Sequence, residues 1–485
     1  MVVKRADPSN KLINLYVMII MILLAEYNTI ERLHEFVIER LKAHIAENEL
    51  TYFIETYGCQ MNTHESEKIA GVLDALGYCA VAEKAEADLI IFNTCCVRQH
   101  AEARLYGNVG ALKDHKANVK GALIAVSGCV MQQEDAAKKL MKRFPFVDIA
   151  FGTNGIHRLE SMLYDALIEG KRALCVDTDE AIIEDVPIRR DNAPGAFVNI
   201  IYGCNNFCTY CIVPYVRGRE RSRQPDDIIK EVEELCNKGI SEITLLGQNV
   251  NSYGNDLSAD ITFENLLKRI DSDTDIKRLR FMTSHPKDMS DGLIDCYGSL
   301  GSLCEHIHLP VQSGSNSVLQ LMNRRYTREH YLSQIKRLKA RVPDLAVTTD
   351  IIVGFPGETE QDFEDTLSLV KEVGYDAAYT FAYSKRSGTK AADMEGHLDK
   401  QTMSERLARL NALVKDSMRE RNSVYLGRTV EVLAESPGKR GRSEISGRTR
   451  TAKTVSFEGS SGDVGQYMMV KIDKVMAHTL HGVRV

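Results

Sequence analysis

Short β-type runs alternate with helical sequence along most of this chain, and they do so in two separate series. The first series covers residues 51–175 and contains the runs TYFIETYG, ADLIIFNTC, ALIAVSGC and VDIAFGT. Such alternation is typical of a parallel sheet with helices on its faces. We therefore predict an N-terminal Rossmann-like parallel α/β domain over residues 51–175, preceded by a helical N-terminal extension over residues 1–50.

The second series begins after residues 176–195, an acidic and then basic stretch with prolines that is typical of a linker. Its six β-type runs are FVNIIYG, EITLLG, RLRFMT, HIHLPV, AVTTDIIVGF and AYTFAYS, separated by helical sequence. Six strand–helix units predict a central partial (β/α)6 barrel of the TIM type over residues 196–422. In such barrels the functional groups lie at the carboxyl ends of the strands.

Residues 423–485 contain the short runs TVEVLAE, EISGRT, TVSFEG and YMMVKIDKV, which predict a small antiparallel β-barrel. From residue 421 onward the chain has 11 Lys and Arg against 6 Asp and Glu, a net charge of +5, whereas the whole chain has −6. The total excludes a protein that is basic over its entire surface. A basic module on an acidic body favours RNA binding, because phosphate contacts supply most of the non-specific affinity, with a merely solvated surface as the alternative.

The apolar segment Leu12–Ala25 follows three basic residues, as in a secretion signal. It is shorter than the roughly 20 residues of a membrane span, and apolar residues continue beyond it at helical spacing. We expect an amphipathic helix that packs on the body rather than a cleaved signal. Twelve cysteines in a chain of 485 residues indicate reduced thiols, and hence a cytoplasmic protein without membrane association.

Cys204, Cys208 and Cys211 form a C-x3-C-x2-C triplet just beyond the first run of the second series. A four-iron cluster is normally held by four cysteines, so a triplet leaves one iron open to a small molecule with its own donor atoms. The amine and carboxylate of S-adenosylmethionine suit that position. Structural zinc is the alternative, although zinc sites generally use four ligands and no second pair of cysteines follows at the usual spacing.

Cys59, Cys95 and Cys129 each follow one of the first three β-type runs. The carboxyl ends of parallel strands share one edge of a sheet, so these cysteines could converge on one site. The alternative is that they are isolated, buried and unreactive thiols. We interpret the remaining cysteines in that way, namely Cys79, Cys96, Cys175, Cys236, Cys296 and Cys304.

With the aromatic Tyr210 before its last cysteine, CNNFCTYC resembles the signature of the radical S-adenosylmethionine superfamily. The segments ETYGCQMN, FNTCCVRQHAE and SGCVMQQ resemble the N-terminal domain of the methylthiotransferases in that superfamily, and LLGQNVNSYG, RFMTSHP and TDIIVGFPGETE resemble their barrel motifs. The resemblance covers residues 51–485 and is greatest to the MiaB type. It implies that residues 423–485 form a TRAM domain, a small RNA-binding barrel.

The resemblance also implies two [4Fe–4S] clusters, a catalytic one on Cys204, Cys208 and Cys211 and an auxiliary one on the three strand-end cysteines. Bare glycine backbone would admit S-adenosylmethionine, neutral side chains would bind its zwitterionic end, and an arginine would pair with its carboxylate. The predicted cofactor-binding residues are Tyr210, Gly247, Gln248, Gln312, Ser313, Arg325 and Gly354. The predicted RNA contacts of the TRAM domain are Arg440, Arg442, Arg448, Arg450 and Lys453.

For the function, the MiaB type implies methylthiolation of C2 of N6-dimethylallyladenosine beside the tRNA anticodon, with two molecules of S-adenosylmethionine consumed. The expected partners are the tRNA anticodon stem-loop, an electron donor of flavodoxin type and a donor of sulfur or clusters. Other branches of the family modify threonylcarbamoyladenosine in tRNA or an aspartate of a ribosomal protein. A non-catalytic RNA-binding protein with structural zinc is the alternative from a different class.

Overall fold

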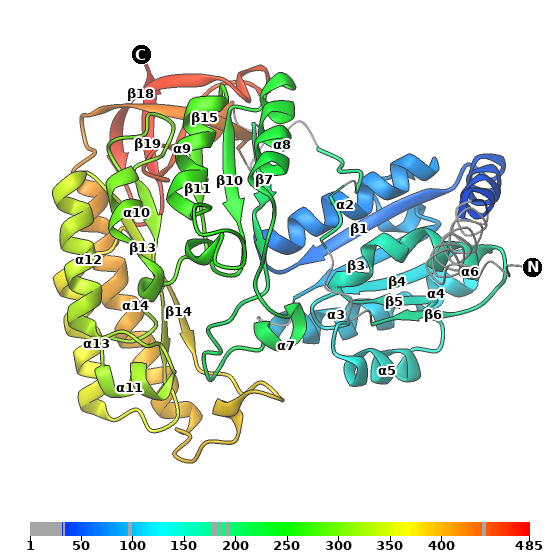
Figure 1. Cartoon of the computed structure of the whole chain (residues 1–485), viewed down its shortest axis with the longest axis horizontal. Helices are drawn as coiled ribbons and strands as arrows, with labels where there is room; N and C mark the ends of the chain where they lie inside the picture. The colour runs from blue at the N-terminus through cyan, green and yellow to red at the C-terminus, as the bar shows by residue number, and fades with distance from the viewer. Residues whose placement is uncertain are drawn as a thin grey trace, which may run out of the picture.

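The computed structural model of the chain describes residues 32, 34–95, 99–176, 182–184, 186–190, 194–438 and 443–485. Three bodies follow one another along the chain: an α/β sheet, a partial barrel and a small closed β-barrel (Figure 1). The partial barrel contacts both of the other bodies.

Six parallel strands form the N-terminal sheet, in the order β2-β1-β3-β4-β5-β6. Their bounds are β1 (Thr51–Tyr57), β2 (Cys79–Ala80), β3 (Leu89–Thr94), β4 (Leu123–Gly128), β5 (Ile149–Phe151) and β6 (Ala173–Cys175). The strand order reverses between β1 and β3, and doubly wound sheets bind ligands at the carboxyl ends of the strands beside such a reversal. The predicted Rossmann-like domain is confirmed.

Helices cover both faces of this sheet: α2 (Gln60–Leu76), α3 (Gln99–Ala111), α4 (Lys113–Asn118), α5 (Glu134–Arg143) and α6 (Leu159–Leu167). Alternate residues of a strand point to opposite faces. In β3, Leu89 and Ile91 therefore join one hydrophobic core with residues of α2 and α6, while Ile90 and Phe92 join a second core with residues of α3 and α5.

The N-terminal extension is helical over residues 34–47, where Leu41 and Ile45 are buried in the core shared with α2. The apolar segment Leu12–Ala25 lies outside the described residues. None of the helices in the described part of the chain combines the length and the apolar composition that crossing a bilayer requires.

Within the predicted linker, residues 182–184 and 186–190 have neither helix nor strand, whereas Gly195 begins β7. The linker is nevertheless held in place. Arg190 lies 2.6 Å from Glu67 of α2 and 2.9 Å from Glu231 of α8 (Pro225–Asn237), and so joins the N-terminal domain to the partial barrel.

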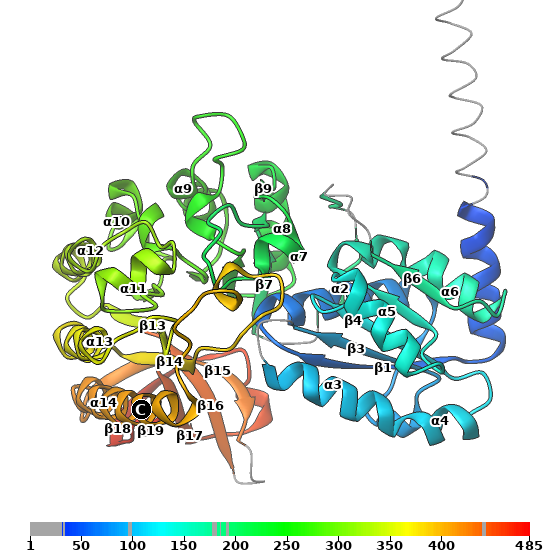
Figure 2. The ribbon, with the colours of Figure 1, turned by 90° about the horizontal axis from the view of Figure 1, so that it is seen from below.

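Six parallel strands form the partial barrel: β7 (Gly195–Asn199), β10 (Glu242–Leu246), β11 (Arg278–Phe281), β12 (His306–His308), β13 (Ala346–Val353) and β14 (Ala377–Ala382). They pair as β11-β10-β7 and β12-β13-β14, and a bridge between Leu279 and Leu303 joins the two halves. The strands β7 and β14 are thus the two edges of the barrel (Figure 2). The predicted partial (β/α)6 barrel is confirmed.

The helices of the barrel lie outside its strands, where they bury the outward side chains in one large core. Besides α8 they are α9 (Phe263–Asp273), α10 (Asp291–Cys296), α11 (Asn316–Leu321), α12 (Arg328–Arg341), α13 (Glu360–Val373) and α14 (Lys400–Ser423). A short antiparallel pair, β8 (Ile201–Tyr202) with β9 (Arg221–Ser222), interrupts the repeat after β7. Between these two strands lies α7 (Val213–Arg217).

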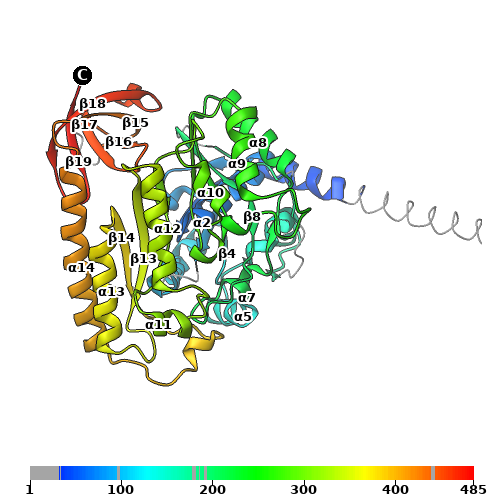
Figure 3. The same ribbon diagram turned by 60° about the vertical axis from the view of Figure 1, so that its left-hand side comes forward.

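Five strands close the C-terminal barrel in the order β15-β16-β17-β19-β18. They are β15 (Thr429–Pro437), β16 (Glu444–Thr449), β17 (Thr454–Glu458), β18 (Tyr467–Val475) and β19 (Leu480–Arg484). The predicted small barrel is confirmed, although one strand pair, β17 with β19, is parallel. In Figure 3 this barrel lies at one end of α14.

Most of the cysteines assigned as unreactive thiols are at least partly buried. Cys296 and Cys304 are buried, and Cys175 and Cys236 are half-buried. The prediction is wrong for Cys79, which is exposed. It belongs to β2, a two-residue strand at the edge of the sheet, which has no further strand to cover it.

Candidate active site

The three strand-end cysteines lie at one edge of the N-terminal sheet. The last residues of β1, β3 and β4 pair in register, and Cys59, Cys95 and Cys129 follow these ends within two positions. The Cys59 and Cys95 side chains are hydrogen-bonded to each other. A Cβ atom on Gly58, where φ is +139°, would lie 2.4 Å from Cys95 Cβ, so glycine allows this close approach. The predicted auxiliary ligands are therefore brought together, whereas Cys96 lies outside the described residues.

Arg217, at the end of α7, faces this edge from the barrel. Its Nη2 donates to Cys129 Sγ at 3.1 Å, and its Nη1 lies 2.7 Å from Glu65 Oε1 of α2. Both charged side chains are buried. The hydrogen bond with Cys95, helped by the charge of Arg217, holds the pKa of Cys59 below that of a free thiol, although burial acts in the opposite direction.

The cysteine triplet occupies the loop between β8 and α7. Cys208 is buried, and Cys204 and Cys211 are half-buried. Burial raises the pKa of Cys204 to about 11 and that of Cys211 to about 12. The Cys204 and Cys211 thiols are therefore neutral at pH 7 unless a metal ion stabilises the thiolate form.

Backbone contacts fix the shape of this loop. Asn323 Nδ2 donates to the carbonyl oxygens of Asn206 and Phe207 at 3.2 and 3.0 Å. Gly203 has φ +74°, and a Cβ atom there would lie 1.9 Å from the carbonyl oxygen of Arg219. These contacts hold the loop in one conformation.

Of two adjacent arginines near the triplet, one is buried and the other is exposed. Arg324 is buried, with Nη1 3.4 Å from Cys208 Sγ and Nη2 donating to the carbonyl oxygen of Pro310 at 2.8 Å. Arg325, the predicted partner of the cofactor carboxylate, is exposed, and its Nε lies 3.5 Å from Asn323 Oδ1. The cation beside the triplet is therefore Arg324, which the sequence analysis missed.

Buried polar atoms that have no hydrogen-bond partner among the described residues gather beyond the carboxyl ends of β10 and β11. They are Oε1 of Gln248, Oδ1 of Asn249, Oδ1 of Asn251, Oγ of Ser284 and Nε2 of His285. On the triplet's loop, Nδ2 of Asn206 shares this property. Unpaired burial of such atoms is costly, so they indicate a site for a polar ligand. Gln248 is the one member that the sequence analysis predicted.

Protein atoms occupy the space beside the two predicted glycines. A Cβ atom on Gly247 would lie 2.3 Å from Ile201 Cγ2, and one on Gly354 would lie 2.4 Å from Met403 Cγ. Each glycine thus makes room for a neighbouring side chain.

The other predicted cofactor residues also have internal contacts. Gln312 has φ +68° and pairs through its backbone with β13. Ser313 is fully buried, and its Oγ lies 3.3 Å from Thr366 Oγ1. The Tyr210 ring packs edge to face on Phe355 with centroids 6.4 Å apart.

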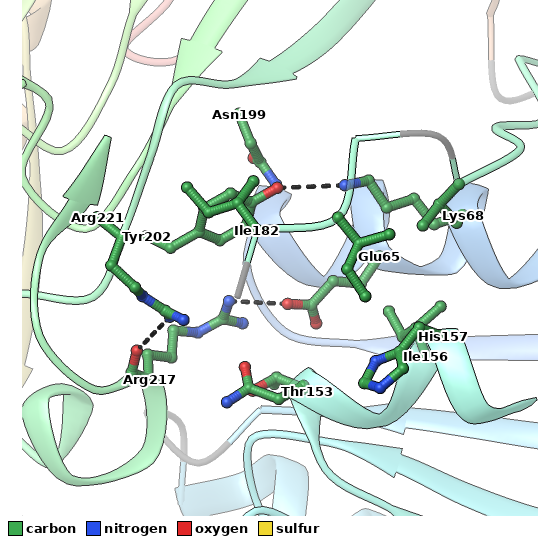
Figure 4. A pocket seen from close by; sticks show the side chains of 13 residues that line it. Glu65, Lys68, Thr153, Ile156, His157, Ile182, Asn199, Tyr202, Arg217 and Arg221 are labelled. Atoms are coloured by element: carbon green, nitrogen blue, oxygen red, sulfur yellow. Dashed lines mark hydrogen bonds and ion pairs between the residues drawn. The ribbon is translucent and has the colours of Figure 1, made fainter. Parts of the chain in front are cut away.

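A cavity lies where the N-terminal domain meets the barrel, next to Arg217 (Figure 4). Its polar lining includes Lys68, whose Nζ donates to Tyr202 Oη at 3.2 Å, and the ion pair of Arg217 with Glu65. Arg221 also lines the cavity. The charged side chains around the cavity are thus mostly cationic, so its potential favours a small anion.

The described cations predicted to bind RNA lie between the closed barrel and the partial barrel. Arg450 Nε lies 2.8 Å from Glu305 Oε2, and Lys453 Nζ lies 2.8 Å from Asp376 Oδ1. Arg448 Nε lies 2.6 Å from Glu435, within the closed barrel. These three charges are already paired, whereas Arg440 and Arg442 lie outside the described residues.

Buried arginines of β11 complete this contact. Arg278, only 1% exposed, donates to the carbonyl oxygen of Arg448, and Arg280 donates to that of Arg450, both at 2.8 Å. Because these arginines lie on the amino side of the barrel, the closed barrel covers the end opposite to the cysteine triplet.

The arrangement of the two cysteine sets differs from the ligand set of a single metal ion. Within the described residues, no three His, Cys, Asp or Glu side chains converge closely enough to hold a single ion. A four-iron cluster requires less convergence, because each cysteine binds a separate iron. Two sets of three cysteines, each facing a buried arginine, fit such clusters in donor type and in charge.

Three stretches of the chain match known families. Residues 198–370 match the Radical SAM superfamily, residues 51–152 the uncharacterized protein family UPF0004, and residues 423–485 the TRAM domain. The radical S-adenosylmethionine methyltransferase TsrM from Kitasatospora setae has a similar fold, with a TM-score of 0.53 and 13% identity over 71% of this chain and 74% of that chain. Fold and triplet together define a radical S-adenosylmethionine enzyme, which uses a [4Fe–4S] cluster and S-adenosylmethionine.

Similar full-length relatives narrow the class. The tRNA-2-methylthio-N(6)-dimethylallyladenosine synthase of Clostridium tetani is 51% identical over 436 residues, which cover 90% of this chain and 96% of the relative. The protein of the same name from Caldicellulosiruptor saccharolyticus is 52% identical over 433 residues, covering 89% and 92%. The chain belongs to the tRNA-2-methylthio-N(6)-dimethylallyladenosine synthase family.

Proposed function

We propose that this protein is a tRNA methylthiotransferase that adds a methylthio group to C2 of N6-dimethylallyladenosine beside the anticodon. The proposal includes two [4Fe–4S] clusters, one on Cys204, Cys208 and Cys211 and one on the strand-end cysteines of the N-terminal domain. The observation that carries it is the contact of Arg217 with Cys129, because α7 begins two residues after Cys211 and so places the two cysteine sets beside each other.

Proximity is a chemical requirement of this reaction. When bound, the two clusters would supply the electron that splits S-adenosylmethionine and the sulfur that reaches the base. The short α7 keeps the separation of the two sites small, which shortens the path of any reactive species and limits side reactions with water.

The residues around the triplet suit S-adenosylmethionine. Arg324 places a buried positive charge beside Cys208, which compensates thiolate charge in a low-dielectric environment. The unpartnered atoms of Gln248, Ser284 and His285 can hydrogen-bond the amino acid and ribose parts of the cofactor. Of the predicted cofactor contacts, Gln248 thus has the most direct support.

The TRAM barrel would add affinity for the tRNA anticodon stem-loop through its net positive charge. We further propose that a flavodoxin-type protein delivers electrons, that a separate donor restores the sulfur, and that the reaction takes place in the cytoplasm. The proposed domain boundaries are 1–50, 51–175, 196–422 and 423–485, with a linker at 176–195.

The alternatives receive less support. Relatives that align over nearly their full length are named for dimethylallyladenosine, and not for threonylcarbamoyladenosine or a ribosomal-protein aspartate. A non-catalytic RNA-binding protein with structural zinc would have no need of the unpartnered polar atoms beyond β10 and β11.

Nucleoside analysis tests the proposal. The chain is expressed in a bacterial strain that lacks its own methylthiotransferase, and digested tRNA is examined by mass spectrometry. We expect 2-methylthio-N6-dimethylallyladenosine to appear at the expense of N6-dimethylallyladenosine. A methylthiolated threonylcarbamoyladenosine, or no methylthiolated nucleoside at all, contradicts the proposal.

Cysteine variants separate the two sites. The anaerobically purified Cys208→Ala variant should neither cleave S-adenosylmethionine nor form product. Cys129→Ala should still release 5′-deoxyadenosine while forming no methylthiolated product. Normal product formation by Cys129→Ala would show that the strand-end cysteines have another role.

A further inference from the structure

The inner face of the edge strand β14 has two large aromatic rings that the protein leaves half exposed. Tyr379 is 55% exposed and Phe381 is 47% exposed. Thr380, which lies between them, points outward, because its Oγ1 is hydrogen-bonded to Asn411 of α14. Since alternate side chains of a strand point to opposite faces, both rings point into the barrel.

The neighbouring strands place polar groups beside these rings. Asp350 and Ile352 of β13 pair in register with Tyr379 and Phe381. His308 of β12 lies 3.5 Å from Asp350 Oδ2, and its ring meets the Tyr379 ring at a centroid distance of 5.8 Å and an angle of 71°. The inner face therefore combines an aromatic wall with a carboxylate that is partly accessible to solvent.

The rings lie between the closed end of the barrel and the triplet. At the amino end, Arg280 and Glu242 form an ion pair, and Arg280 also binds the TRAM barrel, so this end is occupied by protein. Toward the carboxyl end, Ile352 packs in one hydrophobic cluster with Tyr210 of the triplet's loop. Since both rings are half exposed and the amino end is occupied by protein, a ligand would reach them from the carboxyl end.

We propose that Tyr379 and Phe381 hold the N6-dimethylallyladenine inside the barrel and that Asp350 accepts a hydrogen bond from its N6–H. This inference rests on the proposed function and adds the residues that recognise the substrate base. The dimethylallyl group is apolar and uncharged, and it suits aromatic rings that would otherwise face water. An adenine that has left the anticodon loop offers a flat face for stacking.

The inference explains why exposed aromatic residues lie on this inner strand face. Large aromatic residues on an inner strand face are usually covered by protein. Here they remain accessible inside the partial barrel, between the cysteine triplet at one end and the TRAM barrel at the other. A substrate base bound there would lie beside the triplet. Asp350 also disfavours a substituent with its own carboxylate, such as threonylcarbamoyl, because like charges repel at close range.

Equilibrium binding tests the inference without turnover. The affinity of the full chain for two fluorescent anticodon stem-loops is measured by anisotropy, one with adenosine and one with N6-dimethylallyladenosine at the target position. We expect tighter binding of the prenylated RNA by the wild type. In Phe381→Ala and Tyr379→Ala the affinity for the prenylated RNA should fall by about 10-fold, the usual size of one stacking contact. The affinity for the unmodified RNA, which lacks the dimethylallyl group, should fall less, so that the preference decreases.

Three controls complete the design. Phe36→Ala removes an equally exposed aromatic ring from the N-terminal helix, 57% exposed, and should keep the preference. Phe381→Tyr retains a ring and should restore it. Because both target rings are half exposed, the alanine variants should unfold at nearly the same temperature as the wild type.

The outcomes distinguish this inference from the proposed function. No preference in the wild type, or an unchanged preference in the Tyr379→Ala, Phe381→Ala double variant, overturns the inference. The wild type could show a preference that depends on both rings and yet form no methylthiolated nucleoside. That result supports base binding by Tyr379 and Phe381 and contradicts the proposed function. If the wild type forms the product but shows no preference, the proposed function is supported and base binding by Tyr379 and Phe381 is contradicted.

Discussion

Arg217 Nη2 lies 3.1 Å from Cys129 Sγ, while Nη1 of the same guanidinium lies 2.7 Å from Glu65. One side chain of the barrel is therefore inserted into the N-terminal domain at its cysteine edge. The five-residue α7 connects this arginine to the triplet. A buried cation at this place compensates thiolate charge and the Glu65 carboxylate together.

Replacement of Arg217 tests this connection. Arg217→Gln leaves Glu65 buried without its partner, which typically costs about 3–5 kcal/mol. We expect urea unfolding to report a loss of that order, and iron analysis after anaerobic reconstitution to show fewer iron atoms per chain. An Arg217→Gln variant with wild-type stability and iron content would exclude the role assigned to this residue.

The matching control removes both charges. Glu65→Gln combined with Arg217→Gln replaces a buried ion pair by two neutral amides, so the double variant should be more stable than the sum of the single effects predicts. Unfolding free energies of the four proteins give this coupling directly. Additive effects would mean that the two side chains do not act as a pair.

Cys59 should react as a thiolate in the metal-free protein. Its pKa lies below the usual value of a thiol, because the hydrogen bond with Cys95 and the charge of Arg217 favour the anion. A depressed pKa keeps the thiolate populated as the pH falls below the range where a free thiol becomes protonated. The rate of iodoacetamide labelling at Cys59, followed by peptide mass spectrometry, should thus stay nearly constant from about pH 9 to pH 7.

Two comparisons check the cause of this reactivity. Cys95→Ala removes the hydrogen bond that lowers the pKa of Cys59 most, and should make the labelling rate of Cys59 fall toward neutral pH, whereas Arg217→Gln should raise this pKa by a smaller amount. Cys211, whose pKa burial raises to about 12, should label slowly throughout this range. Equal pH profiles for Cys59 in the wild type and in Cys95→Ala would show that the hydrogen bond has no influence on the thiol.

The sequence predicted the fold well, because most strands are short apolar runs that can be recognised from neighbouring residues alone. In the first two domains each strongly apolar run became a strand, and in β3 every residue is buried. Four strands, β2, β6, β9 and β19, were missed. Strands of two or three residues such as β2 and β6 carry too little periodicity, and their pairing is decided by the sheet beside them.

The site was predicted less completely, because its charged residues depend on loop geometry. Asn323 and Arg325 both have positive φ, so no regular period indicates which of the two adjacent arginines turns toward the triplet. Glu358, just before α13, is buried with its Oε1 2.6 Å from Arg406 Nη1, and Thr359 provides the helix cap, a division of roles that the sequence alone does not indicate. Apart from its position shortly after the triplet, nothing in the sequence indicates that Arg217 contacts the strand-end cysteines.

Arg450 should contribute to domain contact and not to RNA affinity. It binds Glu305 and the carbonyl oxygen of Leu303, and hydrogen bonds of charged groups typically contribute about 1.5–3 kcal/mol. Arg450→Ala should therefore lower the unfolding temperature. The slope of log affinity for tRNA against log salt concentration should remain unchanged, whereas loss of a phosphate contact reduces it by about 1.

Lys471→Ala is the control for this prediction, because Lys471 is exposed on β18. It should leave stability unchanged, and it reduces the salt slope if this face of the TRAM barrel binds RNA. A reduced salt slope in Arg450→Ala would instead show that Arg450 contacts RNA.

Gly203 should be indispensable for the shape of the triplet's loop. Its φ is +74°, and a Cβ atom would lie 1.9 Å from the carbonyl oxygen of Arg219, a backbone atom that cannot move independently. Gly203→Ala should therefore displace Cys204 and abolish S-adenosylmethionine cleavage. Gly239→Ala is the matched control, because Gly239 has φ +85° and nothing within 4 Å of its Cβ position. That variant has only the conformational cost of a left-handed residue, about 1–2 kcal/mol, and should keep its activity; equal activity of both variants would show that the loop tolerates the clash.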